Sequence, residues 1–206
     1  ILDCENCTKV KLRGKIKKWY GDYNDWIKNN GITYLDLYDL TEMTEWGDSY
    51  EYDGLPSGGI YHCESLEEVV LPKNLQGLGV RYFEGCSGLR TVHIPAALEY
   101  ITTIQGMETF PGTSLKKIYL ELSRKNSWII PAYSEYDIEY SIKDDSFREI
   151  DGVLYDSEKN MLLRFPADYK EEYEFPEGII SIEDFAFRNS RMGKLVIPAN
   201  IKYIGM

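Results

Sequence analysis

The side chains that most often carry chemistry are few in this chain, and their spacing brings no catalytic set together. Only two histidines are present among its 206 residues. His93 lies within an alternating apolar stretch and His62 directly precedes a cysteine, so the two are not expected to face one another. No serine or cysteine has an evident histidine partner that would activate it. We therefore expect no catalytic residues and no enzymatic activity.

The four cysteines indicate neither a metal site nor a redox site. Cys4 and Cys7 form a C-x-x-C pair, but a zinc ribbon needs a second pair of ligands at similar spacing. Redox activity of such a pair needs a βαβ context, which the sequence lacks. We expect this pair to form a local disulfide or to stay reduced, Cys63 and Cys86 to be free buried thiols, and the chain to bind no metal and no cofactor.

A repeated segment organises the middle of the chain. Leu66–Pro72 and Leu89–Pro95 share the pattern L-x-x-V-x-(L/I)-P, and Cys63 and Cys86 are separated by the same 23 residues. A third copy begins at Leu115, with extra residues expected between Gln105 and Glu108. Near the C-terminus the pattern returns, because Phe175–Ile182 matches Ile197–Ile204. Such self-similarity predicts stacked coils, since one unit cannot bury its apolar face alone.

Alternation within the repeat predicts which side chains point into the core. Val69 and Leu71 should face inward while Val70 faces outward, because successive strand residues point to opposite sides. Leu75 and Leu78 should return to the core on the opposite side of the coil. Phe83 is expected to fill the wide end of the core, and Phe110 is expected to play the same part in the next coil.

The repeat resembles the BspA-like, or Treponema-type, leucine-rich repeat over most of residues 55–206. Asp151–Tyr155 and Leu162–Pro166 resemble a hairpin insertion of that family, and Leu12–Ile16 and Tyr34–Leu37 resemble its N-terminal entry segment. The resemblance implies an α/β, strand-dominated leucine-rich-repeat solenoid, a right-handed curved coil stack with 22–23-residue repeats. It also implies secreted or surface-anchored proteins of anaerobic bacteria that engage host or neighbouring-cell proteins.

A helix is expected to cap the N-terminal end of the stack, which would otherwise expose core. Trp19, Tyr23, Trp26 and Ile27 have the spacing of one helix face. Over residues 22–30, Asp22 would be the N-cap and Gly31 the residue that ends the helix. We expect four parts: residues 1–54 as the cap with the first repeat strand, 55–120 as repeats, 121–170 as an insertion and β-hairpin, and 171–206 as C-terminal repeats.

The net charge of −11 argues against polyanionic partners. Nucleic acid and anionic bilayers would be repelled over most of the surface. No run of 18 apolar residues is present and no signal peptide is recognisable at the start of the chain, which begins without Met. We expect an extracellular or cell-surface location, with a lipid anchor in an outer membrane left open, and a monomeric protein.

Two surfaces are candidates for ligand binding. Outward positions of the strands should form parallel files on the concave face of the solenoid, comprising Tyr34, Asp36, Glu68, Val70, Thr91, His93, Lys117, Tyr119, Lys194 and Val196. The stretch from Glu121 to Arg148 fits no repeat well, and long non-repeat segments are often functional. Its aromatic residues are Trp128, Tyr133, Tyr136 and Tyr140.

These features predict a non-catalytic, cell-surface or secreted binding module that mediates protein–protein interaction or adhesion. Its partner would be a protein or glycan on host or neighbouring-cell surfaces. Two alternatives stay open. The exposed aromatic residues favour a glycan-binding module, and the chain could also be a structural spacer within a larger surface protein.

Overall fold

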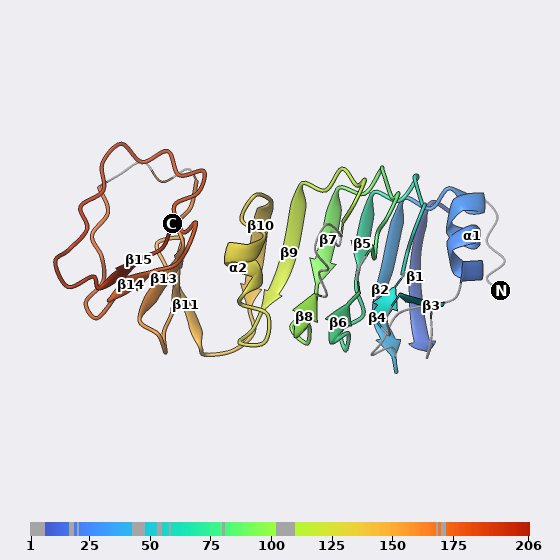
Figure 1. Ribbon diagram of the computed structural model, residues 1–206, viewed down its shortest axis with the longest axis horizontal. Coiled ribbons are helices and arrows are strands. Elements are labelled where there is room, and N and C mark those ends of the chain that lie inside the picture. The colour runs from blue at the N-terminus through green and yellow to red at the C-terminus, as the bar shows by residue number, and fades with distance from the viewer. Residues whose placement is uncertain are drawn as a thin grey trace. The chain divides into compact units, whose positions relative to one another are not determined.

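The computed structural model describes residues 7–16, 19, 21–42, 48–52, 55–57, 59–79, 81–101, 110–167, 169 and 172–206. The chain divides into two compact units. The first unit comprises residues 1–121 with 139–141, and the second comprises residues 122–138 with 142–206. Both are built from short strands that recur along the chain (Figure 1).

The first unit carries a six-stranded sheet in the order β1-β2-β5-β7-β9-β10, a two-stranded sheet of β6 and β8, a hairpin of β3 and β4, and helix α1. The bounds of these elements are β1 Lys9–Lys15, α1 Gly21–Asn30, β2 Tyr34–Thr41, β3 Asp48–Tyr52, β4 Leu55–Ser57, β5 Glu68–Val70, β6 Gly77–Leu78, β7 Thr91–Ile94, β8 Tyr100–Ile101, β9 Lys117–Leu122 and β10 Asp137–Ile142.

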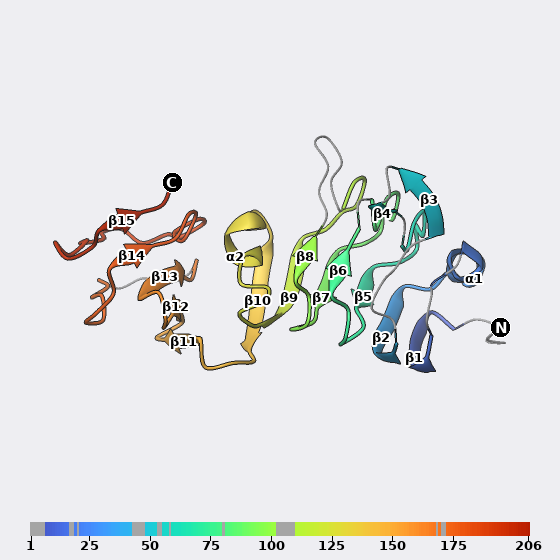
Figure 2. The same cartoon turned by 60° about the horizontal axis from the view of Figure 1, so that its bottom comes forward.

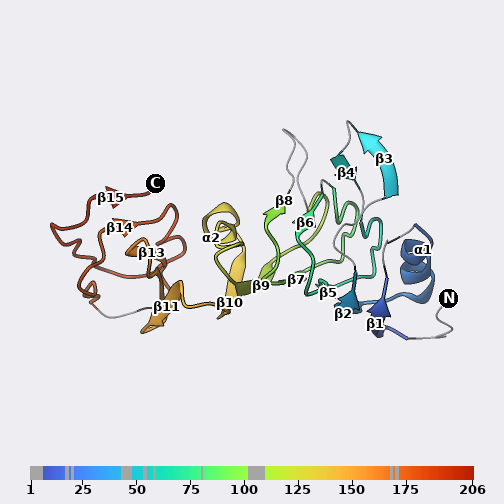
Figure 3. The ribbon, with the colours of Figure 1, turned by 90° about the horizontal axis from the view of Figure 1, so that it is seen from below.

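The coils of the first unit stack in the register that the repeat predicts. Glu68 pairs with Thr91 and Thr91 with Lys117, and all of these strands run parallel. Gly77 pairs with Tyr100 in the parallel β6–β8 sheet. Viewed from below, β6 and β8 lie across the coil from β5 and β7 (Figure 3), and the turned view in Figure 2 agrees. The predicted solenoid of stacked parallel coils is confirmed.

The core of the first unit contains the residues that alternation predicts. Val69, Leu71, Leu75, Leu78 and Phe83 are fully buried, whereas Val70 is partly exposed. These side chains therefore form a continuous apolar interior between the two sheets. The next coil adds its own aromatic residue at the wide end, where the rings of Phe83 and Phe110 stack with centroids 5.6 Å apart.

Cys63 and Cys86 are free and buried, as predicted. Their Sγ atoms lie 3.4 Å from the Tyr61 carbonyl oxygen and 3.5 Å from the Ile60 carbonyl oxygen, respectively. The hydrogen bond with Cys86 and burial raise the pKa of Cys63, so this thiol stays neutral. Cys7 is disulfide-bonded, and Cys4 lies outside the described residues, as does the expected insertion between Gln105 and Glu108.

Helix α1 lies at the N-terminal end of the sheet, beyond β1 (Figure 1). Trp19, which precedes the helix, and Ile27, which lies within it, are buried, and the ring centroids of Trp19 and Tyr23 lie 4.8 Å apart. Gly31 adopts a positive φ of 60° and ends the helix as predicted. Its N–H donates to the Lys28 carbonyl while the Ile32 N–H donates to the Ile27 carbonyl, which is the Schellman arrangement.

Two details of the N-terminal end differ from the sequence prediction. The helix begins at Gly21, so Asp22 lies in its first turn rather than at the N-cap position. There the carboxylate still faces the positive end of the helix dipole. The stretch Tyr34–Leu37, which was expected to be the first strand of the stack, is part of β2, and β1 precedes it and pairs with it in parallel. The prediction missed β1 because its KVKLRGK sequence is mostly polar and exposed.

The second unit contains helix α2 and a five-stranded sheet in the order β11-β12-β13-β14-β15. The predicted hairpin is confirmed, since β12 and β13 pair antiparallel. From β13 onward the strands are parallel, and Ser181 pairs with Tyr203. The elements are α2 Ile129–Ala132, β11 Phe147–Ile150, β12 Val153–Asp156, β13 Met161–Arg164, β14 Ser181–Ile182 and β15 Tyr203–Ile204.

A core of aromatic and aliphatic side chains fills the second unit. Tyr155, Leu162, Phe165 and Ile182 are essentially inaccessible to solvent. The Phe165 and Tyr173 rings meet edge to face, with centroids 4.9 Å apart. No described helix of either unit is long and apolar enough to cross a membrane.

Candidate functional site

The outward side chains of the six-stranded sheet form two parallel rows across neighbouring strands, which we call the outer face. One row contains Tyr34, Glu68, Thr91 and Lys117, and the other contains Asp36, Val70, His93 and Tyr119. These rows contain eight of the ten outward residues predicted to line the binding face, each beside its expected neighbour. All except Asp36 are partly exposed.

A chain of polar and aromatic contacts links the side chains of the outer face. His93 Nε2 lies 2.7 Å from Glu68 Oε1, and because a carboxylate can only accept, the histidine donates. The His93 ring stacks on Tyr119 with centroids 4.5 Å apart. Lys117 Nζ sits 4.9 Å from the centre of the Tyr119 ring and also forms an ion pair with Glu139. The hydrogen bonds to Glu139 and Tyr119 raise the pKa of Lys117, which stays cationic.

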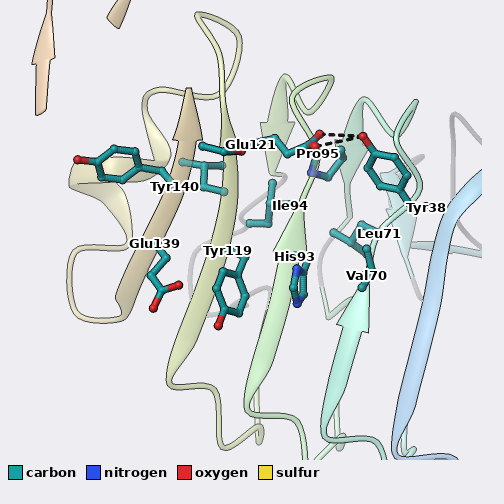
Figure 4. A pocket seen from close by; sticks show the side chains of 12 residues that line it. Tyr38, Val70, Leu71, His93, Ile94, Pro95, Tyr119, Glu121, Glu139 and Tyr140 are labelled. Carbon is teal, nitrogen blue, oxygen red and sulfur yellow. Dashed lines mark hydrogen bonds between the residues drawn. The ribbon is translucent and has the colours of Figure 1, made fainter. Parts of the chain in front are cut away.

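A hollow of about 310 Å³ opens on this face at the ends of the strands (Figure 4). Its size lies at the lower limit for small-ligand pockets, about 300–1,000 Å³. Apolar side chains and the rings of tyrosine and histidine make up most of the lining. The lining residues are Tyr38, Val70, Leu71, His93, Ile94, Pro95, Tyr119, Leu120, Glu121, Glu139, Tyr140 and Ser141.

Glu121 reaches across the hollow from β9 toward β2 (Figure 4). Tyr38 donates its hydroxyl hydrogen to Glu121 Oε1 over 3.1 Å, and the Ala96 backbone N–H donates to Oε2 over 3.3 Å. Burial and the hydrogen bond to Glu121 raise the pKa of Tyr38, which therefore remains a donor at neutral pH. Two donors thus fix the Glu121 carboxylate in the lining of the hollow.

The Asp36 side chain is less accessible to a ligand than its position in the row suggests. Its side chain is 11% exposed, and Lys11 Nζ approaches its Oδ2 to 2.8 Å. The Tyr38 backbone N–H donates to its other carboxylate oxygen over 3.0 Å. This carboxylate therefore joins β1 to β2 and is not free for a ligand. The hydrogen bond with Asp36 raises the pKa of Lys11.

The rows do not continue into the C-terminal repeats as expected. Lys194 and Val196 belong to the second unit and lie outside the six-stranded sheet. Lys194 instead pairs with Glu172, with Nζ and Oε1 3.1 Å apart. The prediction was wrong here because matching repeat positions were assumed to share one sheet, whereas the antiparallel strands β11 and β12 begin a separate sheet.

The aromatic residues of the expected insertion fall in different units. Trp128, Tyr133 and Tyr136 lie in the second unit around α2, where the Tyr133 and Tyr136 rings stack with centroids 6.3 Å apart. Each is partly buried, and the Trp128 indole N–H donates to the Lys125 carbonyl. Tyr140 belongs to the first unit and lines the hollow.

Three residues that make the polar contacts of the hollow, Tyr38, Glu121 and Glu139, were not predicted from the sequence. Tyr38 and Glu121 continue the outward alternations Tyr34-Asp36-Tyr38 and Lys117-Tyr119-Glu121, so extending each strand by two residues would have found them. Glu139 lies on β10, which is outside the recognised repeat. No sequence pattern marks it as a neighbour of Lys117.

The geometry offers little for catalysis or metal binding. Within the described ranges, no three or more His, Cys, Asp or Glu side chains gather in a way that could hold a metal ion. His93 is bound to Glu68 and stacked on Tyr119, and among the described residues no serine or cysteine pairs with it. The outer face is suited to recognition, through mixed charged, aromatic and aliphatic side chains.

Stacked parallel coils with inward aliphatic positions define a leucine-rich-repeat protein. A family model of the BspA type leucine rich repeat region matches residues 55–150 and 167–206 in six copies. The chain therefore belongs to the BspA-type leucine-rich-repeat family, as the repeat predicts. The match includes residues 121–150, which were expected to be an insertion. Proteins of this family and fold are typically non-catalytic, and the fold is generally that of a protein-interaction or surface repeat module.

Two solved structures are similar to this chain. One is a leucine-rich repeat protein from Eubacterium ventriosum, with 14% identity and a TM-score of 0.45, covering 93% of this chain and 55% of that one. The other is the pneumococcal vaccine antigen PcpA, with 18% identity and a TM-score of 0.40, covering 85% and 42%. The chain thus spans about half the length of these proteins. No curated protein matches it.

Proposed function

We propose that this chain is a cell-surface or secreted module that binds a protein ligand, in an adhesive role, on the outer face of its six-stranded sheet. The observation that carries the proposal is the pair of in-register rows that combine partly exposed aromatic, charged and aliphatic side chains. Aromatic residues at the centre, surrounded by polar side chains, are typical of protein–protein interfaces.

The hollow strengthens this proposal because it gives the sheet a place for an anchoring side chain. Interfaces gain most of their binding free energy from a few residues buried in such pockets. The stacked His93–Tyr119 pair, which lines the hollow, presents partly exposed rings to a partner. A partner that covered the hollow and the two rows would contact β2, β5, β7, β9 and β10 at once.

The test is a binding screen of the purified chain against immobilised extracellular-matrix proteins and bacterial surface proteins. We expect at least one partner with a dissociation constant in the micromolar range or below. Thr91→Arg, at the centre of the outer face, should weaken binding at least 30-fold, and Tyr119→Ala about 10-fold. Glu177→Ala, an exposed change in the second unit, is the matched control. No partner at micromolar concentration, or equal binding by Thr91→Arg, would contradict the proposal.

Glycan binding is a second candidate, favoured by the ring cluster of Trp128, Tyr133 and Tyr136 in the second unit. Partly exposed rings present apolar faces on which a sugar could stack, although the Trp128 N–H is already used by Lys125. A glycan array would show selective binding that Trp128→Ala abolishes and Tyr119→Ala leaves intact. An array with no signal rejects this candidate and leaves the outer-face proposal untouched.

A further inference from the structure

The C-terminal stretch of the chain carries a charge opposite to that of the rest. Residues 185–206 contain none of the 34 acidic residues and four of the 23 basic ones, which are Arg188, Arg191, Lys194 and Lys202. At about 150 mM salt the screening length is about 8 Å, so a bound group senses mainly the charges close to it. This stretch can therefore attract an anion although the net charge of the whole chain is −11.

Arg191 is available to a ligand, whereas two of the other cations are already engaged. Arg188 donates to Ser134 Oγ over 3.1 Å, and Lys194 pairs with Glu172 over 3.1 Å. Arg191 is exposed, and within the described ranges its side chain forms no ion pair and no hydrogen bond. Its guanidinium charge is therefore not offset by a described carboxylate.

Arg191 borders a second hollow, of about 610 Å³, which we call the C-terminal hollow. Its described lining consists of Ala167, Asn189, Ser190 and Arg191, with no carboxylate among these four residues. The volume falls within the range of small-ligand pockets, about 300–1,000 Å³. This lining combines one cation with an amide and a hydroxyl, and its apolar part is the Ala167 methyl group.

Backbone hydrogen bonds hold the walls of the C-terminal hollow together. The Phe165 N–H donates to the Ala186 carbonyl over 2.7 Å, and the Arg191 N–H donates to the Ala167 carbonyl over 3.2 Å. Phe165 and Ala186 belong to the buried core of the second unit. Asn189 has a φ of 65°, in the left-handed region that asparagine tolerates better than most residues. The polar side chains are therefore carried by a turn that is anchored to the core.

The hydrogen-bonding groups of the C-terminal hollow suit a ligand rich in oxygen. Ser190 Oγ accepts from the Met192 N–H over 3.4 Å, which leaves its hydroxyl hydrogen to donate. The exposed Asn189 amide offers two donor hydrogens and one acceptor. Both groups match the hydroxyls of a sugar, which donate and accept in turn. A guanidinium pairs with a carboxylate through two parallel N–H groups, so Arg191 selects an acid.

We propose that the C-terminal hollow binds an acidic sugar residue, whose carboxylate pairs with Arg191 and whose hydroxyls bond to Asn189 and Ser190. One guanidinium offsets one negative charge, so a carboxylate fits better than a phosphate monoester, which carries about −1.5 to −2 at pH 7. An acidic peptide side chain would use fewer of the neutral donors. The site lies in the second unit and goes beyond the proposed function, which concerns the outer face.

The direct test is an NMR titration of the intact ¹⁵N-labelled chain with three small probes. Methyl β-glucuronide is the acidic sugar, methyl β-glucoside has the same ring without the carboxylate, and N-acetyl-glutamate amide represents an acidic peptide. We expect saturable shifts with the glucuronide at Asn189, Ser190 and Arg191, with a dissociation constant of about 1 mM, as suits a ligand of this size. The glucoside should bind at least about 10-fold more weakly, and the glutamate amide at least about 3-fold more weakly.

Variants separate the hollow from the general basic charge of this stretch. Arg191→Gln should reduce glucuronide affinity at least about 10-fold, and Arg191→Lys, which keeps the charge without the paired N–H groups, should lie between. Asn189→Gly removes the amide while glycine keeps the left-handed backbone, so a loss of about 2–5-fold is expected. Lys202→Gln is the matched control, because Lys202 is an exposed cation of the same stretch that does not line the hollow. It should leave the affinity unchanged.

Four results would overturn the proposal. Equal binding of glucuronide and glucoside would show that the carboxylate is not recognised. Tighter binding of the glutamate amide would assign the hollow to an acidic peptide. Equal losses in Arg191→Gln and Lys202→Gln would indicate charge attraction without a defined site. Loss of binding in Trp128→Ala, with Arg191→Gln unaffected, would assign the sugar to the ring cluster of Trp128.

Failure of this site and failure of the proposed function are observed separately. Thr91→Arg, which alters the outer face, should leave glucuronide binding unchanged. If the glucuronide does not bind but a protein partner still depends on Thr91, only the assignment of the C-terminal hollow falls. If the glucuronide binds as expected and no protein partner is found, the C-terminal hollow stands and the proposed function falls.

Discussion

At the scale of single residues, buried polar side chains hold parts of this repeat protein together at defined positions. Asn24 is 1% exposed and links three segments. It accepts a hydrogen bond from the Trp19 indole over 3.1 Å and donates to the Gly59 carbonyl over 3.0 Å. A buried donor or acceptor that loses its partner retains the full cost of its desolvation.

Replacing Asn24 with alanine should therefore lower the free energy of unfolding by about 1–3 kcal/mol. Urea denaturation followed by tryptophan fluorescence measures the change. Asn30→Ala is the control, because Asn30 makes one partly exposed hydrogen bond to Trp26 within the same helix, and it should cost less. Equal effects of the two substitutions would show that Asn24 does not link the cap to the first coil.

Asp156 makes the stability of the second unit dependent on pH. Its side chain is 1% exposed, and Arg124 contacts it with both terminal guanidinium nitrogens, at 2.5 and 3.0 Å. Burial alone would raise the pKa of this carboxyl, but the hydrogen bonds from Arg124 and the Lys159 backbone lower it. The stabilisation is thus present above the pKa of the unfolded chain, about 3.9, and is lost as pH falls through the folded value.

We expect Arg124→Ala to cost about 1.5–3 kcal/mol at pH 7, the range for hydrogen bonds to charged groups. The difference from the unchanged protein should shrink as the pH falls below about 4. Denaturation at several pH values measures this. Lys159→Ala, which removes an exposed amine 3.9 Å from the same carboxylate, should change stability by less than about 1 kcal/mol. A pH-independent effect of Arg124→Ala would refute the role assigned to Asp156.

At the scale of secondary-structure elements, turns with positive φ set where the capping helix and the first coil meet. Gly31 has a φ of 60° and no atom within 4 Å of the place where a Cβ would lie. An alanine there would meet no clash, so its cost would come only from the left-handed backbone, about 1–2 kcal/mol.

Gly31→Ala should accordingly lower the free energy of unfolding by about 1–2 kcal/mol, and Gly31→Asn should recover part of the loss, since asparagine tolerates this conformation. Gly193 also has free space around it but no positive φ. Gly193→Ala should therefore be neutral or slightly stabilising. Destabilisation by Gly193→Ala that matched Gly31→Ala would count against backbone strain as the cause.

How far the sequence predicts an element depends on whether the element repeats. The constant spacing from Glu68 to Thr91 predicted which strands pair, which side chains are buried, and that His93 and Tyr119 are neighbours. It could do so because matching repeat positions pair in neighbouring parallel coils. Strands β1 and β10 were not predicted as members of the sheet, since neither carries the repeated apolar pattern. Glu139 therefore could not be foreseen, although both rows of the outer face could.

At the scale of the whole molecule, the excess of acidic residues limits the range of partners. The chain carries 34 acidic and 23 basic residues, and its isoelectric point is about 4.7. The basic side chains of the outer face are already engaged, since Lys11 pairs with Asp36 and Lys117 with Glu139. Long-range attraction should thus favour basic ligands and be screened by salt.

We expect no binding to double-stranded DNA or to vesicles rich in anionic lipid at about 150 mM salt, a concentration at which the screening length is about 8 Å. Binding to the protein partner should weaken as the salt concentration rises to about 500 mM. Electrophoretic mobility shift measures binding to DNA, and vesicle co-sedimentation measures binding to the lipid. Interferometry measures binding to the protein partner at each salt concentration. Micromolar affinity for DNA would contradict the account of the surface charge.

The most direct test of the central claim is hydroxyl-radical footprinting of the chain with and without the protein partner found in the screen. Binding on the outer face should protect His93, Tyr119 and Tyr140 from oxidation at least 3-fold. Phe185, Tyr203 and Met206, which are exposed in the second unit, should be oxidised equally in both samples. Protection confined to these three residues, with His93 and Tyr119 unchanged, would show that the outer face is not the binding surface.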